Sequence, residues 1–192
     1  MAVRKRVGVL ALQGDFEAHE KALQRAGADP VEVRTAEQLQ DVDALVIPGG
    51  ESTTMLKLLD AGNMFDALRE FGRAHPMFGT CAGAILLASE VLNPEQRSLG
   101  LMDMAVERNA YGRQLDSRIA RVHGENGNAD LEAVFIRAPK IRRVGAEAKV
   151  LARYGGDPVL VEQGKHLAAT FHPELSADSR VHEMFLEKVN GS

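Results

Sequence analysis

One cysteine stands in a sequence context that could make it a nucleophile. Cys81 is the central residue of Gly79-Thr80-Cys81-Ala82-Gly83, which follows a short apolar run and precedes strong helix formers. This is the strand-turn-helix pattern of a nucleophile elbow, in which small neighbours leave room for a strained central residue. The first amides of the helix would favour a thiolate over a thiol. We therefore predict a reactive cysteine, with a buried cysteine in a plain tight turn as the alternative.

A nucleophilic cysteine needs a base, and His172 is the best of six histidines. It follows the apolar run 167–171, so it leaves a predicted strand near its end, and Pro173-Glu174 comes next. Residues i and i+2 of an extended chain point to the same side, so Glu174 could orient the imidazole and stabilise its charged form. The prediction is a set of nucleophile, base and orienting carboxylate, Cys81, His172 and Glu174.

The other five histidines have surroundings that indicate surface positions. His19 lies among acidic residues on a predicted helix, where a solvated charged face is favoured over a metal site, and no metal site is predicted. Surface positions are also predicted for His75, His123, His166 and His182.

Acyl transfer through Cys81 also needs amides aimed at the developing oxyanion. The N–H of Ala82, directly after the cysteine, is one natural donor. Gly49 and Gly50 follow a predicted strand and could present a second, although the segment Pro48-Gly49-Gly50-Glu51-Ser52 could also be a phosphate-binding nest or a simple turn.

Composition sets broad limits on function. The 192 residues are 45% hydrophobic and 26% charged, with a net charge of −4, which argues against nucleic acid as the main partner. No apolar run is long enough to span a membrane or to serve as a secretory signal. A lone cysteine cannot form an internal disulfide, so we expect a cytoplasmic protein without a membrane partner.

The order of predicted elements indicates an α/β fold. Apolar strands at 7–12, 31–33 and 43–47 alternate with amphipathic helices at 16–26, 52–59 and 64–74, and a further strand is predicted at 131–136. This alternation predicts an open, mostly parallel sheet with helices on both faces. Three short runs at 148–154, 158–162 and 166–171 predict a small antiparallel section, and a helix covers 179–189. We expect one domain, residues 1–192.

Six motifs in register resemble a known family. Pro48-Gly49-Gly50-Glu51-Ser52-Thr53, the Cys81 elbow and Phe171-His172-Pro173-Glu174-Leu175 are similar to the motifs of class I glutamine amidotransferases, which have a flavodoxin-like fold. More narrowly, the chain resembles the glutaminase subunits of pyridoxal 5′-phosphate synthase. That narrower likeness rests on segments 10–15, 108–114 and 135–139. Tyr111 and Ala84 depart from the family pattern, and neither departure touches the chemistry.

The resemblance implies hydrolysis of L-glutamine to glutamate and ammonia, which passes to a separate synthase subunit. It implies no cofactor, with Cys81, His172 and Glu174 as the catalytic residues. The glutamine site would be formed by the following residues: Gly49, Gly50, Glu51, Ser52, Ala82, Arg108, Ile136 and Arg137. Activity is expected to depend on docking of the synthase near Gln13-Gly14 and the Gly49-Gly50 peptide.

The sequence is also compatible with three other functions. The chain could be a different cysteine hydrolase acting on aldehydes or peptides, a non-catalytic regulatory subunit, or an amidotransferase that serves another synthase. The basic residues Lys140, Arg142 and Arg143 could form a docking edge, although a solvated charged face is favoured.

Overall fold

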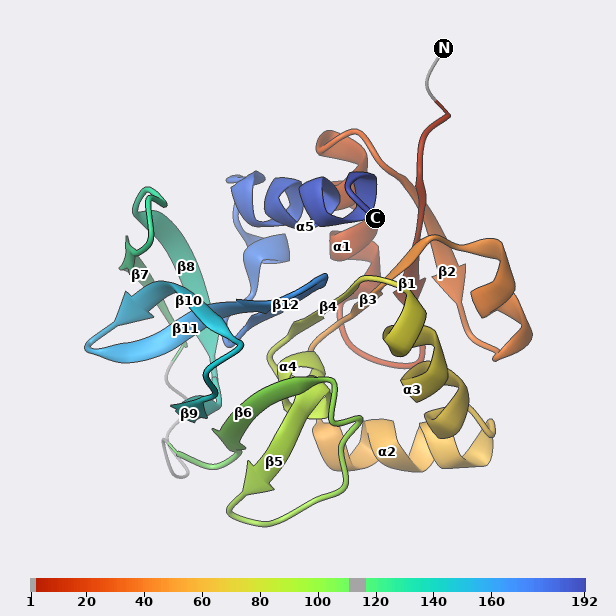
Figure 1. The fold of residues 1–192 in the computed structure, drawn as a ribbon, viewed down its shortest axis with the longest axis horizontal. Coiled ribbons are helices and arrows are strands. Elements are labelled where there is room, and N and C mark those ends of the chain that lie inside the picture. The colour runs from red at the N-terminus through yellow and green to blue at the C-terminus, as the bar shows by residue number, and fades with distance from the viewer. Residues whose placement is uncertain (1–2, 111–116) are drawn as a thin grey trace.

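The computed structural model describes residues 3–110 and 117–192, and in these the chain forms one large twisted sheet, a smaller sheet and covering helices (Figure 1). The large sheet has nine strands in the order β2-β1-β3-β4-β12-β11-β10-β7-β8, and the small one has the order β5-β6-β9. The strands are β1 (Arg6–Leu10), β2 (Asp29–Val33), β3 (Ala44–Ile47), β4 (Met77–Thr80), β5 (Ala88–Leu92), β6 (Met102–Glu107), β7 (Ser117–Gly124), β8 (Leu131–Ile136), β9 (Lys140–Val144), β10 (Lys149–Tyr154), β11 (Asp157–Gln163) and β12 (His166–Ala169). The helices are α1 (Phe16–Arg25), α2 (Ser52–Ala61), α3 (Phe65–Ala74), α4 (Ala82–Leu87) and α5 (Arg180–Asn190), with short 3₁₀ helices η1 (Glu37–Asp41) and η2 (Pro173–Leu175).

Three neighbouring parallel strands determine where a site can form. β3 pairs with β4 and β4 pairs with β12, all in the same direction. Their carboxyl ends therefore lie at one edge of the sheet, where ligands of open α/β folds bind. Gly49 follows β3, Cys81 follows β4 and His172 follows β12, so segments far apart in the sequence converge at this edge.

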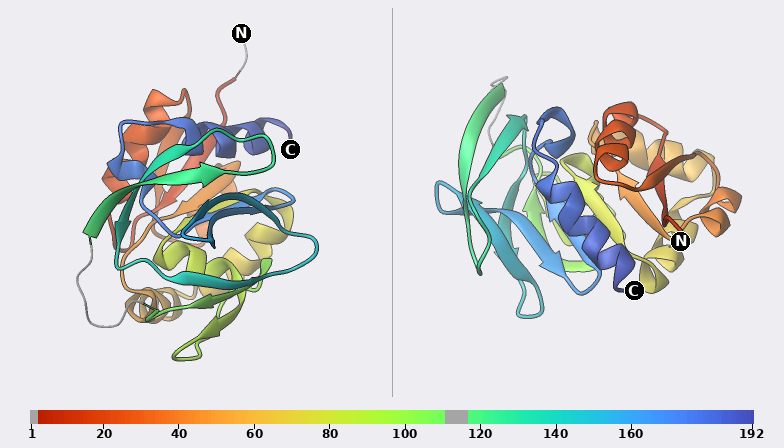
Figure 2. Two further views of the ribbon diagram at one scale, coloured as in Figure 1. Left: turned by 90° about the vertical axis from the view of Figure 1, so that its left-hand side faces the viewer. Right: turned by 90° about the horizontal axis from the view of Figure 1, so that it is seen from above.

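Helices cover both faces of the parallel half of the sheet. They are needed because successive apolar side chains of each strand point to opposite faces. In β3, Ala44 and Val46 pack on the face covered by α1 and α5, while Leu45 and Ile47 pack against α2, α3 and α4. The two helical layers are seen above and below the strands in Figure 1 and again from above in Figure 2. The predicted fold class, a mostly parallel sheet with helices on both faces, is confirmed.

The antiparallel half is larger than predicted. The three short runs near the C-terminus do form β10, β11 and β12, but β12 also joins the parallel half through β4. Strands β7, β5 and β9 were not predicted. Their sequences are polar on the exposed side and carry little apolar alternation; β7, for example, has one fully buried residue, Val122.

Two further observations bear on the sequence predictions. The described residues contain no helix long and apolar enough to cross a membrane. Of segment 108–114, which carries part of the narrower resemblance, the structure describes residues only as far as Ala110, and Tyr111 to Gln114 lie outside the described residues.

Candidate active site

Cys81 lies at a sharp turn between β4 and α4, as the elbow pattern predicts. Its φ of 51° and ψ of −109° are strained for a residue with a side chain. Both flanking glycines are required by close packing. A Cβ on Gly79 would lie 2.4 Å from the Gly83 backbone, and one on Gly83 would lie 2.1 Å from the Ile47 carbonyl oxygen. The glycines thus allow α4 to pack directly on the sheet at the turn that carries Cys81.

The cysteine is largely buried, but polar groups surround it. The residue is 7% exposed, its N–H donates to the Ala169 carbonyl at 2.9 Å, and its Sγ lies 4.0 Å from the Ile136 carbonyl oxygen. The first contact ties the elbow to the end of β12, and the second brings the end of β8 to the thiol. Ile136, predicted from the resemblance, therefore does lie beside Cys81.

His172 reaches the same place from the end of β12. A Cβ built on Gly49 would lie 2.7 Å from His172 Cε1 and 3.3 Å from Cys81 Cβ, so the ring and the cysteine flank one glycine. The chain here is anchored by the His172 N–H, which donates to the Val134 carbonyl at 2.8 Å. Gly49 is therefore a close-approach position between the two side chains.

Glu174 holds the far side of the His172 ring. Nδ1 of His172 lies 2.6 Å from Glu174 Oε1, and the Glu174 side chain is only 1% exposed. The contact does not arise along an extended strand as predicted. Pro173 instead starts η2, so Glu174 meets His172 across a 3₁₀ turn. This pairing leaves Nε2 as the ring nitrogen available to Cys81.

The surroundings of His172 favour its protonated form. Burial by itself lowers the pKa of the imidazole, but hydrogen bonds to Cys81 and Glu174 outweigh burial and raise the pKa to about 10. An imidazolium beside a cysteine stabilises the thiolate. Cys81, His172 and Glu174 therefore have the geometry and electrostatics of a cysteine nucleophile with a base and its orienting carboxylate.

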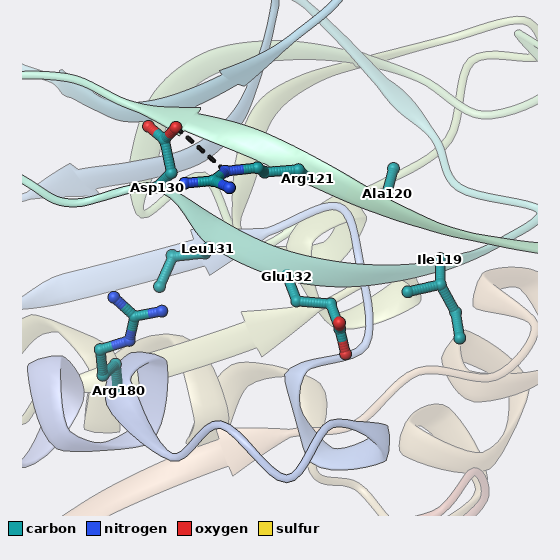
Figure 3. A pocket seen from close by; sticks show the side chains of 7 residues that line it. All are labelled: Ile119, Ala120, Arg121, Asp130, Leu131, Glu132 and Arg180. Atoms are coloured by element: carbon teal, nitrogen blue, oxygen red, sulfur yellow. Dashed lines mark hydrogen bonds and ion pairs between the residues drawn. The ribbon is translucent and has the colours of Figure 1, made fainter.

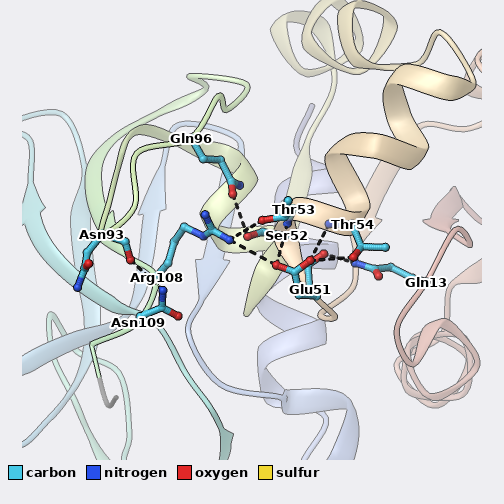
Figure 4. A network of polar contacts seen from close by, with 9 residues as sticks. All are labelled: Gln13, Glu51, Ser52, Thr53, Thr54, Asn93, Gln96, Arg108 and Asn109. Atoms are coloured by element: carbon cyan, nitrogen blue, oxygen red, sulfur yellow. Dashed lines mark hydrogen bonds and ion pairs between the residues drawn. The ribbon is translucent and has the colours of Figure 1, made fainter. Parts of the chain in front are cut away.

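The loop after β3 forms a polar network beside this group (Figure 4). Glu51 caps α2 by accepting from the Thr53 and Thr54 amides, and Gln13 Nε2 donates to the Glu51 carbonyl at 2.6 Å. Partial burial opposes ionisation of Glu51, but hydrogen bonds from Thr54 and Thr53 lower its pKa to about 2. Glu51 is consequently an anionic cap.

Arg108 approaches the same loop from the end of β6. Its Nη2 lies 2.6 Å from Thr53 Oγ1 and 3.4 Å from Glu51 Oε1, and its side chain is 12% exposed (Figure 4). The buried Arg108 Nε has no hydrogen-bond partner within the described residues. Sequence reasoning found Arg108 but missed Thr53 as its partner, although Thr53 lies within the Pro48–Thr53 motif.

The remaining predicted site residues differ in their placement. Gly50 is exposed with a φ of 132°, and a Cβ there would lie 2.7 Å from Gln13 Nε2. Ser52 is buried and donates its hydroxyl proton to Gln96 Oε1 at 3.2 Å, so its hydroxyl oxygen can act only as an acceptor toward a ligand. Ala82 is buried as the first residue of α4, and Arg137 is exposed with a φ of 46°.

Three of the histidine predictions were wrong. His19 and His182 are 0% exposed and His166 is 6% exposed, whereas surface positions were expected. His19 lies against Glu174, with 3.2 Å between His19 Nε2 and Glu174 Oε2. Within the described ranges, no group of three or more His, Cys, Asp or Glu side chains is placed to hold a metal ion.

A separate cavity of about 390 Å³ opens between the β7–β8 hairpin and the start of α5 (Figure 3). Arg121 in its wall is paired with Asp130 at 3.3 Å, and Arg180 lies opposite. None of its lining residues belongs to the group around Cys81. This cavity is therefore distinct from the candidate active site.

Replacing Gly49 with alanine should disturb this group while leaving the fold intact. The new Cβ would lie 2.7 Å from the His172 ring, and since that contact is a side chain, the ring is expected to move. Displacement of a reacting group by about 1 Å can cost about 100-fold in rate. We expect a loss of this size in the turnover of glutamine, the substrate that the family resemblance implies, with an unchanged melting temperature. Wild-type turnover would show that the ring is not packed against Gly49.

Comparisons with known proteins show the family of the chain. Residues 9–191 match the model of the SNO glutamine amidotransferase family. The chain is 62% identical over 191 residues to pyridoxal 5′-phosphate synthase subunit PdxT of Solibacter usitatus, covering 96% of this chain and all of the relative. It is 57% identical to the corresponding subunit of Koribacter versatilis, covering 97% of each chain.

Solved structures place the fold in the same group. A crystal structure of a glutamine amidotransferase superposes with a TM-score of 0.89 at 50% identity, covering 96% of this chain and 98% of that one. The structure of PurLQS from Thermotoga maritima, 17% identical, shares the fold with a TM-score of 0.68 over 98% of this chain and 97% of that one. Match to the family model over nearly the whole length shows that the chain belongs to the SNO glutamine amidotransferase family.

Proposed function

We propose that this chain is the glutaminase subunit of a pyridoxal 5′-phosphate synthase. It hydrolyses L-glutamine to L-glutamate and ammonia, and the ammonia passes to a separate synthase subunit. The observation that carries the proposal is the convergence of Cys81, His172 and Glu174 at the carboxyl ends of adjacent strands. The names of the 62% and 57% identical relatives support the choice of synthase.

The chemistry follows from the placement of these three side chains. The Cys81 thiolate attacks the side-chain amide carbonyl of glutamine, and the His172 imidazolium gives its proton to the leaving nitrogen. Ammonia departs and a thioester to Cys81 remains. His172 then takes a proton from water, which attacks the thioester and releases glutamate and the free thiol. Glu174 keeps the ring oriented and stabilises its charge throughout.

The oxyanion that forms at the amide carbonyl needs backbone donors. Ala82 supplies the N–H directly after the nucleophile, and the Gly49-Gly50 peptide supplies the second. The second donor is in contact with the segment after β1, since a Cβ on Gly14 would lie 2.0 Å from the Gly49 carbonyl oxygen. Docking of the synthase at Gln13-Gly14 is thus able to set the orientation of this peptide.

The α-amino and α-carboxylate groups of glutamine require charged and backbone partners. Arg108 has a buried Nε without a partner within the described residues, and a buried unpaired donor is unfavourable, so a substrate carboxylate there would satisfy it. Glu51, anionic and adjacent to Arg108, would pair with the amino group, and Ser52, Gly50, Ile136 and Arg137 complete the wall.

The test is to follow nitrogen from glutamine into product. Glutamine labelled with ¹⁵N in the side-chain amide is incubated in three mixtures: with the chain alone, with the synthase subunit alone, and with both proteins together. Each mixture also contains ribose 5-phosphate and glyceraldehyde 3-phosphate, the synthase substrates that the family resemblance implies. We expect labelled pyridoxal 5′-phosphate only in the complete mixture, with glutamate formed in equal amount. Glutamate without labelled cofactor would indicate service to another synthase, and no glutamate in the complete mixture would refute the glutaminase assignment.

A further inference from the structure

Two buried histidines lie behind Glu174 and take no part in the chemistry described above. His19 comes from α1 and His182 from α5, helices that pack together on one face of the sheet (Figure 1). Both are 0% exposed, and His19 Nδ1 lies 3.0 Å from His182 Nε2. Burying a polar ring costs free energy unless its nitrogens are hydrogen-bonded, and a hydrogen-bonded polar network inside a core can fix the position of the groups that it contacts.

His19 connects this pair to the candidate active site. Its Nε2 lies 3.2 Å from Thr80 Oγ1 and 3.2 Å from Glu174 Oε2. The first contact is a hydrogen bond, whereas the second is a close polar contact, and the buried Glu174 Oε2 has no hydrogen-bond partner within the described residues. Since Thr80 directly precedes Cys81, His19 lies beside both the orienting carboxylate and the elbow.

Both histidines are neutral in this environment. Burial, followed by the proximity of His182 and His172, holds the pKa of His19 well below its usual range. Burial, with a smaller contribution from Arg25, lowers the pKa of His182 to about 4. Each ring therefore carries one N–H and one bare nitrogen.

One unpartnered nitrogen of His182 indicates which ring donates and which accepts in the contact between His182 and His19. His182 Nδ1 is buried without a hydrogen-bond partner within the described part of the chain. A buried N–H without a partner is rarer than a bare acceptor, so the proton lies on His182 Nε2 and is donated to His19 Nδ1. His19 must then carry its own proton on Nε2, where it points to Thr80 and Glu174.

We propose that His19, held by His182 and bonded to Thr80, is a positioning residue whose Nε2–H lies 3.2 Å from Glu174 Oε2 and holds that carboxylate in place, so that Glu174 in turn fixes the His172 ring. This role rests on the proposed function where glutamine turnover is the measurement. A neutral donor suits the role, because it stabilises the Glu174 carboxylate without competing with His172 for its charge. It also ties Thr80, and with it the approach to Cys81, to the same two helices.

The test compares two substitutions at His19 with a matched control. The amide of His19→Gln can place an N–H near the position of Nε2, whereas His19→Leu retains bulk without a donor. His166→Leu is the control, because His166 is also buried and accepts from the Met77 N–H at 3.1 Å without touching Glu174. Melting temperature measures the structural cost that all three variants share.

The first readout is the pH dependence of Cys81 alkylation by iodoacetamide in the isolated chain, which needs no glutaminase activity. The ionisable groups facing His19 are Glu174, His172 and His182, with Arg25 near His182. A loosened Glu174 supports the His172 imidazolium less well, so the thiolate requires a higher pH. We expect the alkylation midpoint to rise by about one pH unit in His19→Leu, and to stay at its wild-type value in His19→Gln and His166→Leu.

The second readout is glutamine turnover with the synthase subunit present. His19→Leu should lower kcat by about 10- to 100-fold with KM unchanged, a loss typical of removing an outer-shell partner, and His19→Gln should recover most of it. A wild-type alkylation profile in His19→Leu, or equal losses in all three variants, would overturn the proposal. If the wild-type complex hydrolysed no glutamine while the alkylation profiles still differed, the proposed function would fail and the positioning role would stand.

Discussion

Replacement of Cys81 by alanine should abolish glutamine hydrolysis in the complete synthase mixture. Without the sulfur no thioester intermediate can form at the elbow. Loss of a catalytic nucleophile costs on the order of 10⁶-fold in kcat in a comparable hydrolase. We therefore expect glutamate release at the background rate, measured by coupled oxidation of glutamate or by release of ¹⁵N-ammonia.

The same variant provides its own control for folding. Alanine removes one sulfur atom and meets the same backbone strain at φ 51° as cysteine does, so the melting temperature should change little. The mixture containing Cys81→Ala should still make pyridoxal 5′-phosphate when ammonium salts replace glutamine, because the synthase subunit is untouched. Glutamine-dependent cofactor formation at the wild-type rate would mean that Cys81 is not the nucleophile.

The edge of the sheet at which Gly49, Cys81 and His172 converge could be predicted from the sequence, because the strands and turns that form it have local sequence patterns. Strands buried on both faces are continuous apolar runs, and the turn after each strand carries glycine or a small residue, as in Pro48-Gly49-Gly50 and around Cys81. Convergence of the three turns followed from the rule that ligands bind at the carboxyl ends of parallel strands. Gly49 was predicted as an oxyanion donor, whereas the structure adds its close approach to the His172 ring.

The parts that sequence missed depend on tertiary contacts. His19 has charged neighbours along the chain, but His19, Ala22 and Leu23 share the buried face of α1 at spacings of three and four residues. His182 likewise shares a buried face with Phe185 and Leu186. Helical spacing could have identified both as buried, since a polar residue on an apolar face must find a partner inside.

The polar strands β7 and β9 were missed for a different reason. β7 pairs with β8 along its length, yet most of its side chains are exposed, so the backbone hydrogen bonds rather than apolar alternation define it. β9, Lys140–Val144, contains the basic residues considered as a docking edge. In the structure Arg142 pairs with Glu107, and Arg143 Nη1 lies 2.7 Å from Asp103 Oδ1. These arginines pair within the small sheet, which is sufficient to explain them.

Substitution of Glu174 by glutamine should cost on the order of 10⁴-fold in kcat, which is the loss seen when the orienting carboxylate of a catalytic triad is neutralised or removed. The amide oxygen can still accept from His172 Nδ1, but its NH₂ group would then face His19 Nε2, so two donors would meet. The ring loses both its counter-charge and a well-fixed partner.

The pH dependence should change in a definite direction. Burial lowers the pKa of His172, and the hydrogen bonds to Cys81 and Glu174 together raise it to about 10. Removing the carboxylate takes away one of the two raising contributions, so His172 in Glu174→Gln should lose its proton at lower pH than in the wild type. An NMR titration of the His172 ring measures this directly, and the alkylation of Cys81 should require correspondingly higher pH.

A matched substitution distinguishes the loss of the Glu174 charge beside His172 from the loss of a carboxylate charge elsewhere in the protein. Glu125 is paired with Arg153 at 2.8 Å on the antiparallel half, and Glu125→Gln removes the same charge without touching the elbow. It should leave kcat and the His172 titration unchanged. If Glu174→Gln titrated like the wild type and kept its turnover, the carboxylate would not be supporting the imidazolium, and the rise in the His172 pKa would have to come from Cys81 alone. That result would also contradict the positioning role proposed for His19, which acts through Glu174.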